Sequence, residues 1–161
     1  MQAAIARSLG DSLQYWDEPV LITGSNLATN LIDPFLDKVG QTYILTYKNE
    51  DMSSKQITIA TSNSLTTGYT VVGTVAANIE GGCRLTFDNK RVRLYYDRYA
   101  AGTGLAFRES TDGGITYGIE QNVVSAFPSP PYMRHGAPTR NLLTPATALL
   151  DQRVTRRKMS L

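Results

Sequence analysis

Two acidic residues occupy equivalent places in this chain. Asp33 follows Leu31-Ile32 and Glu80 follows Asn78-Ile79, and each carboxylate stands at the head of a short strand-like run. Paired carboxyl groups can do acid–base chemistry, because one donates a proton while the other accepts one. An inward-facing position would desolvate Glu80 and favour its protonated form. This arrangement makes Glu80 and Asp33 candidate catalytic residues.

Each candidate also has a structural interpretation that the residues leave open. Asp33 precedes Pro34, and such a pair commonly forms a turn at the entry to a strand. Glu80 can instead cap a strand or pair with Arg84. His135, the single histidine, can be a metal ligand, a hydrogen-bond donor to a sugar, or a packed polar residue.

The serines that close apolar runs reveal a repeat that positions these carboxylates. Ser8, Ser62 and Ser110 are separated by 54 and 48 residues. Alternation of side chains over residues 43–47 and 92–96 indicates β-strands. A period of about 50 residues with several strands is typical of β-propeller blades. An all-β sandwich with accidental self-similarity is the alternative fold.

The repeat divides the chain into blades and a tail. Residues 2–22 are expected to form only an outer strand, residues 31–75 and 79–124 two complete blades, and residues 135–139 the inner strand of another. We therefore predict a partial propeller over residues 1–143 and a short helical tail over 144–161, where Thr144-Pro145 marks a helix start. A propeller has 4–8 blades, so we expect a homo-oligomer to complete the ring.

Composition restricts the partners that this chain can have. Its 161 residues suffice for one domain, and 42 % hydrophobic with 19 % charged residues argues against disorder. A net charge of +2 gives no general attraction to nucleic acid or to a membrane. Cys83 is the single cysteine, so no internal disulfide forms. Without a visible export signal or an apolar span, we expect a soluble, non-exported chain, cytoplasmic or virion-associated, with its compartment otherwise open.

Several linked motifs follow one another along the chain: Ile32-Asp33-Pro34, Tyr47-Lys-Asn-Glu50, Glu80-Gly81, Tyr95-Tyr-Asp-Arg-Tyr99, Ser110-Thr-Asp112 and Arg134-His-Gly136. In this order and spacing they resemble the family-43 glycoside hydrolases, five-bladed propellers that cleave arabinan, xylan and galactan. The resemblance covers about residues 2–140 and implies an oligo- or polysaccharide partner.

The resemblance also implies roles for individual residues. Glu80 matches the family's general acid, and Asp33 matches the aspartate that orients and tunes it. His135 matches a histidine that helps hold a metal ion, often Ca²⁺ on the propeller axis, and no other cofactor is expected. Tyr99, Arg134 and Trp16 are candidate sugar contacts, although most propeller aromatics pack between blades.

Two departures bear on activity. The family's general base has no counterpart in this chain, and inverting hydrolysis needs both acid and base, about 6.5–9.5 Å apart. Where the family commonly has Glu-Gly-Pro, this chain has Glu80-Gly81-Gly82, which suggests a looser loop. The chain therefore resembles an incomplete hydrolase. The alternative is a non-catalytic glycan-binding or structural module, such as a virion-fibre component or a degenerate hydrolase remnant.

A final motif predicts structure rather than chemistry. The segment Ser110-x-Asp112-x-Gly114-x-Thr116-Tyr117 resembles the Asp-box of sialidase-like propellers. In that turn the aspartate accepts hydrogen bonds from backbone amides, and the final aromatic residue packs beneath the blade.

Overall fold

The computed structural model describes residues 2–8, 15–75, 78–88, 90–98 and 100–123. Every regular element among them is a β-strand, which confirms the all-β prediction. None of these residues forms a helix that could cross a membrane. The expected helical tail, residues 144–161, lies outside the described residues.

The strands are β1 (Ala4–Ile5), β2 (Val20–Leu21), β3 (Gly24–Ser25), β4 (Leu31–Val39), β5 (Thr42–Asn49), β6 (Gln56–Ser62), β7 (Tyr69–Thr74), β8 (Glu80–Thr86), β9 (Val92–Asp97), β10 (Leu105–Ser110) and β11 (Glu120–Asn122).

The first large sheet has the order β3-β7-β6-β5-β4. Strands β4 to β7 are antiparallel in chain order, and β3 joins β7 in parallel. A two-residue turn links β4 to β5, where Gly40 takes φ 61°. Such a turn favours glycine because L side chains disfavour positive φ. The β-branched and aromatic residues of β5 suit the centre of this sheet.

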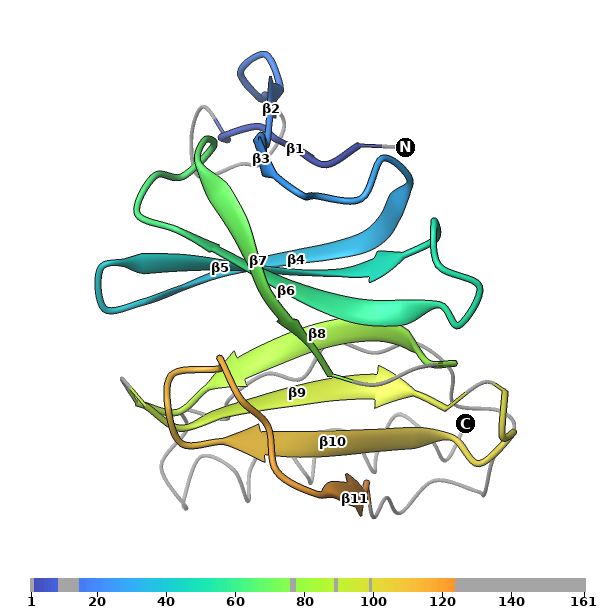
Figure 1. The fold of residues 1–161 in the computed structure, drawn as a ribbon. Coiled ribbons are helices and arrows are strands. Elements are labelled where there is room, and N and C mark those ends of the chain that lie inside the picture. The colour runs from blue at the N-terminus through green and yellow to red at the C-terminus, as the bar shows by residue number, and fades with distance from the viewer. Residues whose placement is uncertain (1, 9–14, 76–77, 89, 99, 124–161) are drawn as a thin grey trace, which may run out of the picture.

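The second large sheet has the order β11-β10-β9-β8 and is antiparallel throughout. In Figure 1 the first large sheet lies between this sheet and a small ribbon of β1 and β2. Neither large sheet closes on itself among the described residues.

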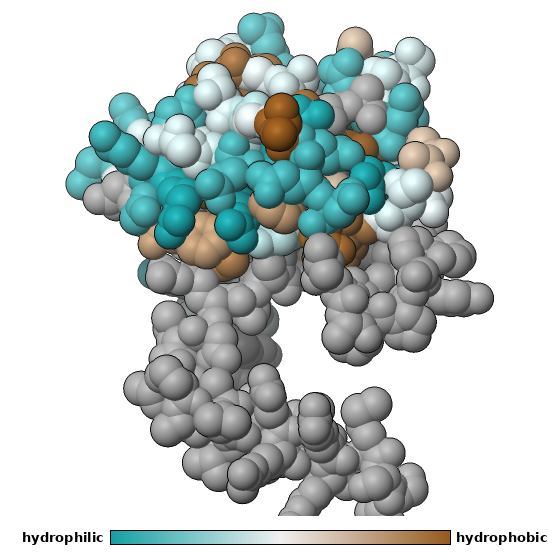
Figure 2. Space-filling model, turned by 90° about the horizontal axis from the view of Figure 1, so that it is seen from below, coloured by the Kyte–Doolittle hydropathy of each residue, from teal (hydrophilic) through white to brown (hydrophobic). Residues whose placement is uncertain are grey.

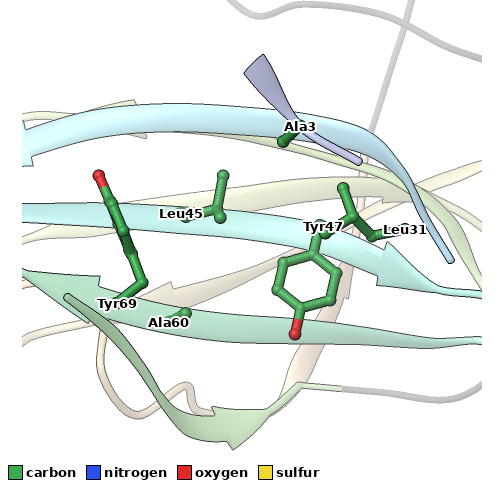
Figure 3. Packing of buried hydrophobic residues seen from close by; sticks show 6 residues of the cluster. All are labelled: Ala3, Leu31, Leu45, Tyr47, Ala60 and Tyr69. Carbon is green, nitrogen blue, oxygen red and sulfur yellow. The ribbon is translucent and has the colours of Figure 1, made fainter. Parts of the chain in front are cut away.

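Alternation along β5 explains how one strand serves both sides of its sheet. Leu45 and Tyr47 pack with Ala3 in the cluster on the ribbon side, whose six side chains appear in Figure 3. Thr46 points the other way and donates a hydrogen bond to the Gly82 carbonyl of β8 at 2.8 Å. Successive side chains of a strand alternate between faces. Strand β5 is therefore buried on both of its faces.

A second core cluster fills the space between the two large sheets. Ile57 of β6 packs there with residues of the second sheet, including Leu94 and Tyr96. A Cβ at Gly82 would lie 3.2 Å from Ile57 Cδ1, so the glycine lets β8 approach β6 closely. The structure thus joins the two sheets through apolar packing along one side of β8.

The N-terminal segment departs from the sequence prediction. Residues 2–22 were expected to form one outer strand, but the described part contains two short antiparallel strands, β1 and β2. Ile22 N donates to the Ala3 carbonyl at 2.9 Å, which extends the pairing by one residue. Because each strand has only two residues, their alternation was too short to recognise in the sequence.

Candidate functional site: the heads of strands β4 and β8

The structure describes three of the predicted site residues and leaves three others outside its described part. Asp33 lies within β4, Glu80 begins β8, and Trp16 forms an isolated bridge with Ser8 beside the ribbon. Tyr99, Arg134 and His135 lie outside the described residues, so their proposed roles stay predictions. Strand β8 packs against β4 and β5, and Asp33 and Glu80 therefore belong to neighbouring strands of two sheets.

Both carboxylates lie beside irregularities in their strands. Asp33 has φ 50° and lies inside a register shift between Ile32 and Phe35. A comparable shift follows Glu80, between Gly81 and Cys83. Bulges re-aim side chains, and left-handed backbone at a non-glycine residue is uncommon. The two strand heads therefore share a local distortion, and Asp33 belongs to a bulged strand rather than to a strand-entry turn.

The Glu-Gly-Gly departure has a physical basis in this bulge. Gly81 has φ 77° and Gly82 has φ 129°. Proline holds φ near −65°, so a proline at position 82 would not fit this backbone. The glycine pair gives the segment a defined left-handed path, and a Cβ at Gly82 would also press on Ile57.

A lysine that the sequence reasoning missed occupies the centre of the site. Lys48 Nζ lies 2.9 Å from Glu80 Oε1 and 3.1 Å from Glu50 Oε1. Lys55 Nζ contacts Glu50 Oε2 at 2.7 Å. Only 6 % of the Lys48 side chain is exposed, against 22 % for Glu80. Lys48 thus links the two sheets through a largely buried ion pair.

The same contacts set the protonation of this network. Burial alone would disfavour the Lys48 ammonium, but hydrogen bonds to Glu80 and Glu50 outweigh burial and raise its pKa. Hydrogen bonds from Lys55 and Lys48 lower the pKa of Glu50. Lys48 and Glu50 therefore favour their charged forms at neutral pH.

A second carboxylate lies opposite Glu80. Asp97, the last residue of β9, is the register partner of Glu80, and only 3 % of it is exposed. Cross-strand partners of an antiparallel pair project on the same face. Asp97 and Lys48 both belong to motifs that the sequence analysis noted. Their proximity to Glu80 was not predictable from those motifs, because it depends on strand register for Asp97 and on the packing of two sheets for Lys48.

The chemistry that these contacts favour is ion pairing. A general acid must donate a proton to its substrate, whereas here Glu80 Oε1 accepts a hydrogen bond from the Lys48 ammonium. Among the residues that the structure describes, no group of three or more His, Cys, Asp or Glu is arranged to hold a metal ion. The Ca²⁺ prediction rests on His135 and stays a prediction.

The Asp-box prediction is confirmed as a structural turn. Asp112 Oδ1 accepts hydrogen bonds from Ile115 N at 3.1 Å and from Thr116 N at 3.0 Å. Ser110 Oγ donates to Asp112 Oδ1 at 2.7 Å. Tyr117 packs against the core between the sheets. All of these groups serve the turn itself.

Comparison with protein-family models, curated proteins and solved structures gives no match for this chain.

Proposed function

We propose that this chain is a glycan-binding part of a family-43-like β-propeller and that it does not hydrolyse glycans by itself. The observation that carries this proposal is the contact between Lys48 Nζ and Glu80 Oε1 at 2.9 Å. The residue that matches the family's general acid is engaged in an ion pair with a largely buried lysine, and the chain contains no match to the general base.

Several features support the propeller part of the proposal. Strands β4 to β7 and β8 to β11 are two consecutive antiparallel meanders, each in chain order. The β8 strand of the second meander packs on the β4 strand of the first, as inner strands of adjacent blades would. The β1–β2 ribbon covers the opposite face of the first meander, where a preceding blade would lie.

Polysaccharide binding is proposed from the family resemblance and from an aromatic residue at the surface. Trp16, a candidate sugar contact, is 54 % exposed. Indole rings combine a large apolar face with a polar N–H group, which suits a sugar ring. Self-association that completes the ring belongs to the same proposal, because two blades fall short of the 4–8 that close a propeller.

One experiment separates binding from turnover. The protein is incubated with aryl arabinosides, xylosides and galactosides, and its binding to arabinan, xylan and galactan is measured by affinity electrophoresis and calorimetry. We expect binding without release of the aryl group. Turnover that survives purification and disappears in Glu80→Gln would contradict the non-hydrolytic role. If the folded wild type neither binds a polysaccharide nor releases the aryl group, the proposed glycan-binding function is wrong.

A second candidate function is hydrolysis by an assembly in which another subunit supplies the base. The left-handed backbone at Asp33 favours it, because strained residues cluster at functional sites. Light scattering coupled to size exclusion, with activity measured across the eluted peak, tests this candidate. It requires activity that rises with oligomer concentration, whereas an oligomer without activity, or activity that elutes with the monomer, excludes it.

A further inference from the structure

On the face of the molecule that Figure 2 shows, hydrophobic residues lie in separate patches among mainly hydrophilic ones. A large contiguous apolar surface would indicate a docking site for a partner. The strongest chemical feature outside the charged network is instead a strained stretch of backbone at the head of β4.

The strain in β4 is centred on Asp33. Four non-glycine residues have positive φ in the described part of the chain, and only Asp33 among them is followed by proline. Left-handed backbone is uncommon outside glycine, and a proline also restricts the residue before it to extended backbone. The φ of 50° at Asp33 is therefore disfavoured for two reasons. Backbone strain of this kind clusters at functional sites.

The bond between Asp33 and Pro34 is open to solvent and stands outside the regular sheet. Both residues are exposed. The register shift between Ile32 and Phe35 leaves them without paired positions in β5. The proline nitrogen has no hydrogen atom, so no ladder hydrogen bond holds it in the sheet. Water and protons can therefore reach this bond directly.

The Asp33 side chain is free to react with its own carbonyl group. It makes no hydrogen bond or ion pair with any other residue that the structure describes. An aspartyl oxygen reaches the carbonyl carbon of the same residue through a five-membered ring, and such intramolecular attack gains greatly from proximity. Asp33-Pro34 is also the single Asp-Pro pair in the sequence.

We propose that the Asp33–Pro34 bond is a site of self-cleavage, which divides the chain into residues 1–33 and 34–161. An oxygen of the Asp33 carboxyl group attacks the Asp33 carbonyl carbon and closes a cyclic anhydride. The bond from this carbon to the Pro34 nitrogen breaks, and the nitrogen takes the proton of the carboxyl group as it leaves. Water then opens the anhydride, which restores the side-chain carboxyl group beside a new C-terminal one. The net reaction is hydrolysis of one peptide bond.

The two products remain associated in the native protein. Ala3 and Leu31 of the shorter product belong to the same core cluster as Tyr47 of the longer one. Strand β3 also pairs with β7 across the cut. Cleavage therefore relaxes the head of β4 and adds an amine and a carboxylate there while the ribbon stays in place. Because β4 packs on β8, these new groups arise next to the candidate site.

The test compares the folded full chain with the same chain unfolded in concentrated urea, both in mildly acidic buffer. Intact mass and denaturing electrophoresis follow the products, and circular dichroism confirms the folded state. We expect cleavage after Asp33 about tenfold faster in the folded chain, because breaking the bond releases strain, and this factor corresponds to about 1.4 kcal/mol off the barrier. The Glu18–Pro19 bond is an internal control that should stay intact, since Glu18 has no positive φ.

Two variants identify the mechanism. Asp33→Asn keeps a side chain that tolerates left-handed backbone but lacks the carboxyl group, so the folded variant should show no cut. Pro34→Ala keeps the carboxyl group and removes the restriction that proline places on Asp33, so cleavage should slow about tenfold or more. Circular dichroism shows whether each variant is folded, and the comparison of folded with unfolded wild type needs neither variant.

The other results overturn the inference. Cleavage that is equal or slower in the folded chain would show that the bulge does not activate the bond. A cut that persists in Asp33→Asn would assign the cleavage to a contaminating protease rather than to the carboxyl group. An intact chain in both states would exclude self-cleavage.

Discussion

The β6–β7 and β10–β11 turns begin with the same residue type and are then built differently. Ser62 ends β6 and donates to the Thr67 carbonyl at 2.6 Å, while accepting from Ser64 N at 2.9 Å. Ser110 ends β10 and accepts from Gly114 N at 2.8 Å. Both serines close a turn through their hydroxyl groups, as the repeat of serines in the sequence suggested.

The difference lies in the residue two positions later. Asp112 collects backbone and hydroxyl donors, including Thr116 Oγ1 at 2.6 Å, whereas Ser64 occupies the corresponding place in the first turn. The first turn is therefore neutral and the second contains a charge. Beneath the second turn, buried Arg84 donates to the Gly113 carbonyl at 3.2 Å. The comparison shows that a turn after a strand-ending serine can be stabilised by hydroxyl groups alone or with the help of a carboxylate.

The largest expected effect comes from the glycines of the two turns. A Cβ at Gly114 (φ 90°) would lie 2.2 Å from Arg84 Nη2, whereas at Gly68 (φ 72°) the nearest atom, Ser62 Oγ, would be 3.6 Å away. We expect Gly114→Ala to lower the free energy of unfolding by about 3 kcal/mol and Gly68→Ala by about 1 kcal/mol. Urea unfolding of both variants measures the difference. Equal losses would show that Arg84 adjusts freely.

Removing the carboxylate should have the next largest effect. Asp112→Ala deletes the acceptor for four donor groups, Ser110 Oγ, Ile115 N, Thr116 N and Thr116 Oγ1, so we expect a loss of about 2 kcal/mol. Ser64→Ala, the matched change in the neutral turn, should cost less than about 0.5 kcal/mol. Thermal and urea unfolding provide the comparison. A stable Asp112→Ala protein would mean that the two turns do not differ in the way their hydrogen bonds indicate.

The charged turn should also respond to acid. Burial would raise the pKa of Asp112, but hydrogen bonds from Thr116, Ser110 and Ile115 outweigh it and hold this pKa well below its ordinary value of 3.8. The stabilisation is therefore complete above pH 3.8 and is lost as pH falls towards the folded-state pKa. The unfolding free energies of wild type and Asp112→Asn, measured between pH 2 and 7, should converge in acid. A difference that is independent of pH would assign the effect to geometry rather than to charge.

A smaller effect than that of Asp112→Ala is expected at the serines that the turns share. Ser62→Ala and Ser110→Ala each remove a buried hydroxyl group and should each cost about 1 kcal/mol. Combining Ser110→Ala with Asp112→Ala should cost less than the sum, because Ser110 Oγ donates to Asp112. A double-mutant cycle measures this coupling. Strict additivity would argue against one hydrogen-bonded unit.

The strands were predictable where their alternation was long enough. Residues 43–47 lie inside β5, which is buried on both faces, and residues 92–96 alternate in burial inside β9. The two strands β1 and β2 escaped recognition because two residues give no period. Asp33-Pro34 resembled a turn in the sequence, but bulge geometry keeps this pair within β4. Local propensity cannot reveal a bulge that depends on the neighbouring strand.

The sequence by itself determined the all-β class and the Asp-box turn. The turn's hydrogen bonds join Ser110, Asp112, Gly114, Ile115 and Thr116, so neighbouring residues satisfy one another without the rest of the protein. Only the tertiary structure decided that Glu80 pairs with Lys48, because these residues are 32 positions apart and meet through the packing of β8 on β5. An ion pair between two sheets depends on both registers and on the distance between the sheets, and the sequence pattern contains neither.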